Sequence, residues 1–184
     1  MRKIALVLMA VAFVFTVSSC GSTKEVSSSP VKTFSQPGAD LVSGNGLIRG
    51  WGMGKADNEA VAHRKALMEA SAALARALEL TYDSTEKEYM DDVSQGNSSR
   101  SMTILGGKQE ARISRVLNGA VIIFDRWAEK TEDGQYTNYI VMELKGEDFL
   151  EELYKEAEKN DVELDKKLLR ELLLKQIDEA GKLE

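Results

Sequence analysis

The sequence predicts an α+β fold, in which an alanine-rich helix packs on a three-stranded mostly antiparallel sheet and a C-terminal helical hairpin follows. Three observations predict it. Apolar and small residues alternate over 46–54, alanines recur at helical spacing before residue 80, and a glycine turn joins two further alternating segments. The expected order is strand, one or two helices, strand, strand, helix and helix.

Residues 1–19 are expected to be a lipoprotein signal peptide. Two basic residues at positions 2 and 3 precede an apolar run from Ile4 to Val17, and two serines then lead to Cys20. A cationic start, a short apolar core and small residues before the cut are what a signal peptidase requires. The run is shorter than the roughly 20 residues that span a bilayer. Cys20, the single cysteine, is therefore predicted to carry the diacylglyceryl group, with an acyl chain such as palmitate on its amine.

Charge and composition exclude several classes of function. Removing residues 1–19 takes away two of the 24 basic residues and none of the 30 acidic ones, which moves the net charge from −6 to −8. Such a surface offers no basic patch for a phosphate backbone, so nucleic acid is not an expected partner. An acylated Cys20 also leaves no cysteine for a disulfide or a thiolate metal site. Gly21, in place of an aspartate, favours sorting to the outer membrane, facing the periplasm.

The remaining chain divides into three predicted parts. Residues 20–45, which begin at the acylated cysteine, are rich in serine, proline and glycine and are expected to form a flexible tether. Residues 46–160 are predicted to be the α+β domain. Residues 161–184 are predicted to be a C-terminal amphipathic helix.

The first strand is predicted over 46–54, and its glycines at 50, 52 and 54 suggest close packing. Their spacing lacks the Gly-Lys-Ser or Gly-Lys-Thr of a phosphate-binding loop, whereas glycines on a strand let another backbone approach closely. The following helix is expected to be capped by Asp57 and to run to about Leu80. Its apolar stripe is predicted to comprise Ala60, Leu67, Ala70, Leu74 and Leu78.

Residues 81–117 are harder to interpret. The helix either continues or bends and restarts near Asp83, before 95–99 breaks it; 100–108 reads as a mobile loop, and a second helical piece is expected over 111–117. Carboxylates at positions 86, 88, 91 and 92 lack the alternating aspartate loop of a calcium site, so a solvated helix face is expected and no metal.

A hairpin is predicted from strands over 119–129 and 135–144, with Asp133-Gly134 in the turn. Strict alternation places Val121, Ile123 and Trp127 on one face together with Asp125. Neither face is clearly polar, so helices or a partner are expected to cover both.

The C-terminal part is predicted to be helical over 146–158 and again after 161. The last helix carries two adjacent leucine stripes, at 164, 168 and 172 and at 169, 173 and, as isoleucine, 177. This surface is broader than a coiled-coil seam, and both packing on the domain and self-association would bury it.

The run from Gly50 to Leu78, a glycine-rich strand followed by an acidic cap and an alanine-rich helix, resembles the LPP-twenty family of bacterial lipoproteins. The segments Leu117–Trp127 and Tyr136–Met142 are similar to that family's strand pair. The resemblance covers residues 46–155. It implies an outer-membrane lipoprotein whose fold is related to dodecin-like and flagellar-assembly domains, with no catalytic residues.

The candidate functional residues are few. Trp51 and Trp127 are possible ligand or partner contacts, although aromatics on paired strands more often serve packing. His63, the single histidine, lacks companions for a metal set or a catalytic relay and is expected at a helix edge. We therefore expect neither enzyme activity nor a cofactor. The predicted function is that of a structural or adaptor lipoprotein, acting by self-association or by binding an envelope protein. The alternative is a binding protein for a small apolar or aromatic ligand held by the two tryptophans.

Overall fold

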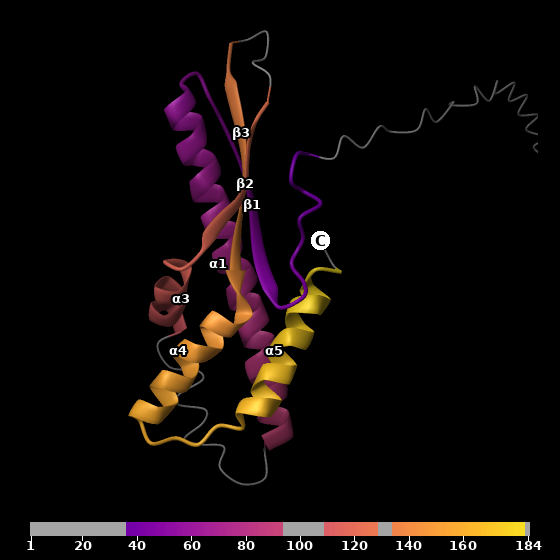
Figure 1. Ribbon diagram of the computed structural model, residues 1–184, viewed down its shortest axis with the longest axis vertical. Helices are drawn as coiled ribbons and strands as arrows, with labels where there is room; N and C mark the ends of the chain where they lie inside the picture. The colour runs from indigo at the N-terminus through magenta and orange to yellow at the C-terminus, as the bar shows by residue number, and fades with distance from the viewer. Residues whose placement is uncertain (1–35, 94–108, 129–133, 183–184) are drawn as a thin grey trace, which may run out of the picture. The chain divides into compact units, whose positions relative to one another are not determined.

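The computed structural model describes residues 36–93, 109–128 and 134–182, all of which belong to one compact unit. Within these residues it confirms the predicted α+β fold with a three-stranded antiparallel sheet (Figure 1). In chain order the elements are β1 (Leu47–Ala56), α1 (Glu59–Val93), α3 (Gln109–Leu117), β2 (Val121–Trp127), β3 (Tyr136–Lys145), α4 (Gly146–Lys159) and α5 (Lys166–Ala180).

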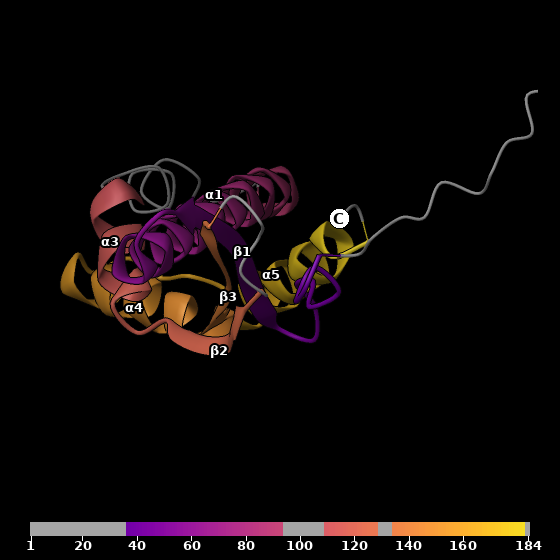
Figure 2. The ribbon, with the colours of Figure 1, turned by 90° about the horizontal axis from the view of Figure 1, so that it is seen from above.

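The sheet has the order β1-β3-β2, so β3 is its central strand and the other two are its edges. Trp51 of β1 lies opposite Val141 of β3, and the pairing is regular along the whole of β1. The β2–β3 register shifts between Ile122 and Phe124, which marks a bulge. The long helix α1 covers one face of this sheet (Figures 1 and 2).

Contact between α1 and β1 is made by backbone against backbone. A Cβ added at Gly52 would lie 2.2 Å from the Ala70 nitrogen, and one at Gly54 would lie 1.9 Å from the Ala62 carbonyl oxygen. The alanines that face these glycines are fully buried. The predicted role of both residue types in close packing is therefore confirmed. Of the predicted stripe, Ala70, Leu74 and Leu78 are buried as expected, whereas Ala60 is exposed and Leu67 is only half-buried. In their place Ala62 and Ala66 face the sheet.

The helix α1 continues past Leu80, which is one of the two alternatives that the sequence left open, and it begins with a different cap. It runs unbroken for 35 residues to Val93, and buries Tyr82 and Tyr89 beyond the expected end at Leu80. The Asn58 side chain accepts a hydrogen bond from the Val61 amide at 3.2 Å, so Asn58 rather than Asp57 caps the helix.

The segment before β1 is part of the domain, which corrects the prediction of a flexible tether up to residue 45. The Trp51 indole donates to the Pro37 carbonyl at 3.0 Å, and the Arg49 amide donates to the buried Ser43 hydroxyl at 3.0 Å. A Cβ at Gly38 would lie 2.9 Å from the Phe124 ring. This segment covers apolar side chains on the sheet face that α1 leaves open. Residues 20–35 of the predicted tether lie outside the described residues.

The C-terminal leucines are buried in the domain. Leu169, Leu173 and Ile177 of α5 join Leu74 and Leu78 of α1 in the main core, to which α4 adds Phe149 and Leu153. Lys175 and Gln176 also donate to Glu88 of α1. Of the two arrangements that the leucine stripes left open, packing on the domain is the one observed, and α5 belongs to the same unit as the sheet.

The remaining predicted elements agree with the structure in outline. The second helical piece is α3, and Gly134 has the positive φ of 80° expected after Asp133. The predicted break at 95–99, the loop over 100–108 and most of the hairpin turn lie outside the described residues.

Candidate functional site

Trp51 lies on the face of the sheet that points away from α1. Gly50 and Gly52 contact the helix, and alternation along the strand directs the side chain between them to the other face. There the Trp51 ring lies 6.2 Å from the Tyr139 ring, and its indole N–H is bonded to Pro37. Trp51 thus fastens the segment before β1 to the sheet.

Trp127 lies on the opposite face, beside α1. It is paired with Asn138, which shares the helix-facing side of β3 with the buried Ile140. The Trp127 ring stacks against His63 of α1, with centroids 6.3 Å apart and planes 24° apart, and meets Tyr136 edge-on at 6.5 Å. The indole is 37% exposed.

The two tryptophans therefore cannot enclose one ligand, because the sheet separates them. The predicted grouping of Val121 and Ile123 with Asp125 is also wrong. The bulge after Ile122 shifts the alternation, so that Val121 lies opposite Glu143 on the outer face while Asp125 lies opposite Ile140 on the helix face.

A chain of polar side chains extends from the buried interior to His63. Asn138 is fully buried, and its Nδ2 donates to Asp125 Oδ1 at 2.7 Å and to the Arg126 carbonyl at 3.2 Å. Asp125 Oδ2 lies 3.3 Å from His63 Nε2. Because both neighbours of the Asn138 nitrogen are acceptors, the amide orientation is fixed; its Oδ1 is buried without a hydrogen-bond partner. The arrangement holds the imidazole in place beside Trp127.

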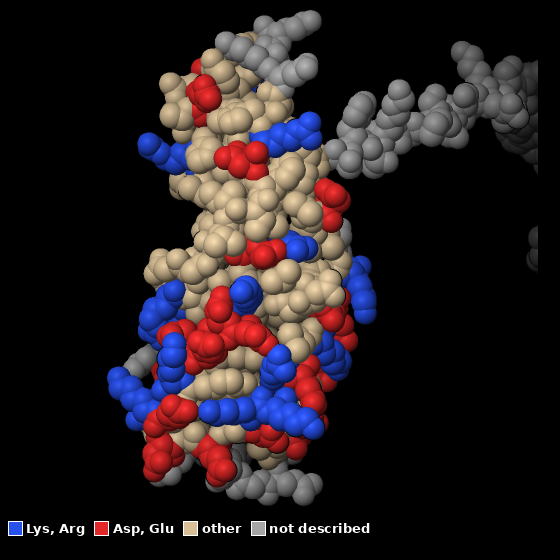
Figure 3. Space-filling view, in the orientation of Figure 1, with Lys and Arg blue, Asp and Glu red and all other residues tan. Residues whose placement is uncertain are grey.

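The edge strand β2 exposes an uninterrupted apolar run. Val121, Ile122 and Ile123 are 54%, 46% and 39% exposed, respectively, and no charged residue lies between Gly119 and Phe124. On the face seen in Figure 3, charged side chains crowd the part over α3, α4 and α5, whereas the part over the sheet carries few of them. Successive exposed apolar residues on an edge strand, which has one side without a neighbouring strand, are typical of a contact surface.

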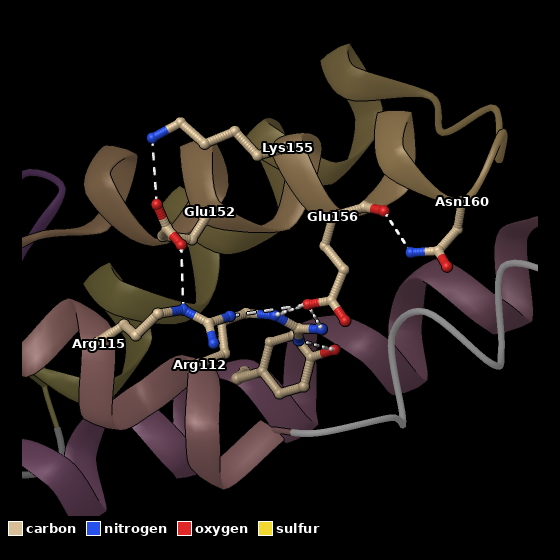
Figure 4. Close-up of polar contacts among 7 residues, drawn as sticks. Arg112, Arg115, Glu152, Lys155, Glu156 and Asn160 are labelled. Carbon is tan, nitrogen blue, oxygen red and sulfur yellow. Dashed lines mark hydrogen bonds and ion pairs between the residues drawn. The ribbon is translucent and has the colours of Figure 1, made fainter.

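A second polar cluster joins α3, α4 and α1. Arg112 of α3 is fully buried, and its guanidinium contacts Glu156 of α4 at 3.0 Å and the Tyr82 hydroxyl at 3.3 Å. Figure 4 shows Arg112 and its neighbour Arg115 directed at Glu156 and Glu152 of α4. The Arg115 pairs are exposed, whereas Arg112 is closed off from solvent. This cluster holds α1, α3 and α4 together, and a ligand cannot reach the buried guanidinium of Arg112.

Burial changes the ionisation of the residues next to Arg112. It raises the pKa of Tyr82 far above its ordinary value, although Arg112 opposes the shift. Burial also raises the pKa of Glu86, with Asp83 acting in the same direction. Tyr82 therefore keeps its proton even above pH 10, where an exposed tyrosine ionises.

The sequence patterns missed these pairings. The contact between Asp125 and His63 depends on the β2 bulge and joins residues 62 positions apart, so no local pattern marks it. The only local signal for a buried position at Arg112 is the pair of apolar residues that follow it in the helix, Ile113 and Val116.

Several predicted features remain untested by this geometry. Cys20 lies outside the described residues. Among the residues that are described, no group of three or more His, Cys, Asp or Glu side chains could hold a metal ion. The helices seen in those same residues include none with the length and apolar character needed to cross a membrane.

Comparison with known proteins gives no family assignment: no family model, curated protein or solved structure matches the chain.

Proposed function

We propose that this chain is a lipid-anchored lipoprotein of the cell envelope, held at the outer membrane through Cys20, and that its domain is a structural or adaptor component that self-associates through β2. The exposed run Val121–Ile122–Ile123 on an edge strand is the observation that carries the proposal. The lipoprotein signal and the resemblance to the LPP-twenty family support the location.

The free edge of β2 can pair with another strand. An edge strand presents unpaired N–H and C=O groups, and soluble proteins usually guard them with charged residues or proline. The segment from Ala120 to Phe124 contains neither. Joining it to a second strand would satisfy these backbone groups and remove apolar side chains from water.

A second copy is the simplest partner. Two identical strands that pair in an antiparallel way about a two-fold axis bring the same apolar residues together from both sides. Anchoring by lipid confines copies to one membrane surface, which raises their effective concentration. The negative charge of the mature chain does not oppose contact at β2, because the run itself is neutral.

The proposed role is not catalytic. The His63–Asp125 pair has the geometry of a base and its orienting carboxylate, but no serine, threonine or cysteine of the described residues hydrogen-bonds to His63.

The anchor is tested by changing Cys20→Ser. We expect the variant to leave the membrane fraction and to keep its melting temperature, because the acylated residue is separate in sequence from the folded unit. Retention of the variant on membranes after a high-salt wash would contradict the lipoprotein assignment.

Self-association is tested in the mature Cys20→Ser chain, which needs no detergent. We expect concentration-dependent dimers by light scattering, and loss of these dimers on Ile122→Lys without loss of helical circular dichroism. Met68→Lys is the matched control, because Met68 is also an exposed apolar residue but lies on α1. A monomer at every concentration would refute the second copy and leave an envelope protein as the partner of β2.

A further inference from the structure

A recess of about 650 Å³ opens between the first turns of α1 and the end of β2. Its lining comprises Asn58, Glu59, Ala60, His63, Arg64, Leu67 and Trp127. The recess lies on the α1 side of the sheet, away from the outer face where Trp51 is fastened to Pro37.

The aromatic wall of this recess is supported by neighbouring side chains. Trp127 rests against His63 on one side and against Tyr136 at its edge. His63 is in turn held by Asp125, and Asp125 by the buried Asn138. A preorganised aromatic surface loses little conformational entropy when a ligand stacks on it.

Polar groups of several kinds surround this wall. Arg64 brings a planar set of N–H donors and Glu59 brings a carboxylate, and both side chains are exposed. When His63 donates from Nε2 to Asp125, its Nδ1 is an acceptor. The recess therefore combines one flat apolar surface with separate donors and acceptors.

We propose that this recess binds a saccharide. A pyranose ring has one apolar C–H face, which an indole can cover, and hydroxyl groups that both donate and accept hydrogen bonds. An apolar or aromatic molecule is best held in an enclosed cavity, whereas this recess is open and carries the charged side chains of Glu59 and Arg64 beside its apolar residues. A phosphorylated ligand would meet Glu59 as well as Arg64, so no net positive charge would hold it.

The proposal does not depend on self-association through β2. The residues that line the recess are distinct from Val121, Ile122 and Ile123. Either surface can therefore fail its test while the other stands.

The experiment is a titration of the mature Cys20→Ser chain with chitotetraose and, separately, with cellotetraose, followed by the two indole N–H signals in ¹H–¹⁵N spectra. We expect saturable shifts of the Trp127 signal and an unmoved Trp51 signal. Indole is titrated in the same way as an aromatic probe. Shifts with indole and with neither saccharide would overturn the proposal, and so would no shift at Trp127 with any probe.

Variants sharpen the result. Trp127→Leu is expected to weaken saccharide binding by at least about tenfold, as loss of an aromatic anchor does. The matched variant Trp51→Leu, on the opposite face, is expected to leave the affinity within about twofold. Arg64→Met changes an exposed side chain that the fold does not need, and weaker binding by this variant is also expected. Equal affinity in Trp127→Leu and the parent chain would refute the site.

Discussion

The sheet end of the domain packs backbone on backbone, whereas the helical end packs large side chains around a buried arginine. At the sheet end the small core consists of Ala66, Ala70 and Ile140, and glycines of β1 bring the strand against α1. At the helical end, leucines of α1, α4 and α5 surround Tyr82 and Phe149, whose rings meet edge-on at 5.0 Å.

The difference explains where the molecule is open to partners. Helix α1 packs on β1 through small residues, while the opposite edge strand β2 keeps three successive apolar residues exposed. At the helical end, large side chains from α1, α4 and α5 fill the core, and the surface is charged (Figure 3).

The sharpest way to break the sheet end is Gly52→Val. Its Cβ would collide with the Ala70 backbone, which cannot move without separating the helix from the strand, so we expect a loss of more than about 3 kcal/mol in the free energy of unfolding. Gly119→Val is the control, because its nearest neighbour would be a single carbonyl oxygen at 3.3 Å. Equal losses in urea denaturation of both variants would show that close backbone approach is not what limits position 52.

The helical end is tested by Arg112→Ala. Removing the buried guanidinium leaves Glu156 and Tyr82 without it, and we expect a loss of about 3 kcal/mol. Arg115→Ala removes a neighbouring arginine that is 53% exposed, and its expected loss is below about 1 kcal/mol. Comparable melting temperatures for the two variants would mean that Arg112 does not hold the three helices together.

A smaller expected effect is a pH dependence of the free energy of unfolding that arises from Tyr82 at the helical end. Tyrosine in the unfolded chain ionises near its ordinary pKa of 10.0, whereas burial keeps Tyr82 protonated in the folded domain. The unfolded state therefore binds fewer protons above pH 10, and the free energy of unfolding falls by up to about 1.4 kcal/mol per pH unit from this group.

Tyr82→Phe removes that contribution. We expect the difference in unfolding free energy between the parent chain and the variant to be constant from pH 7 to 9 and to shift in favour of the variant from pH 10 to 11. A difference that stays constant up to pH 11 would contradict the raised pKa of Tyr82.

Local patterns predicted the elements well because each pattern depends on nearby residues. The glycines of β1 and the alanines of α1 are the two partners of one close contact, and both are visible as regularly spaced small residues. The packing of this strand on this helix could therefore be predicted from the sequence. The stripe of α1 was predicted correctly from Ala70 onward but not in its first turns, since alanines occur there on several faces of the helix and small residues mark direction poorly.

The candidate site was less predictable for a different reason. One extra residue in β2 reverses which face each later side chain takes, and nothing in the run Val121–Phe124 marks the bulge, because all four residues are apolar. The contact of Trp127 and Asp125 with His63 follows from that reversal. The prediction for residues 36–45 was also wrong, since their composition is that of a linker and their order comes from the sheet face that they cover.

The contact between Trp51 and Pro37 has a mechanical consequence. Pro37 is near the first described residue on the side toward Cys20, so a pull on an anchored chain reaches this contact before it reaches the strand pairing. One indole hydrogen bond and the packing of Gly38 on Phe124 would yield first, releasing residues 36–42. Seven fully extended residues span at most about 24 Å, so the length gained on release is this span less the distance that the segment already covers in the fold. The tether between the anchor and the domain would thus lengthen under tension while the sheet stays intact.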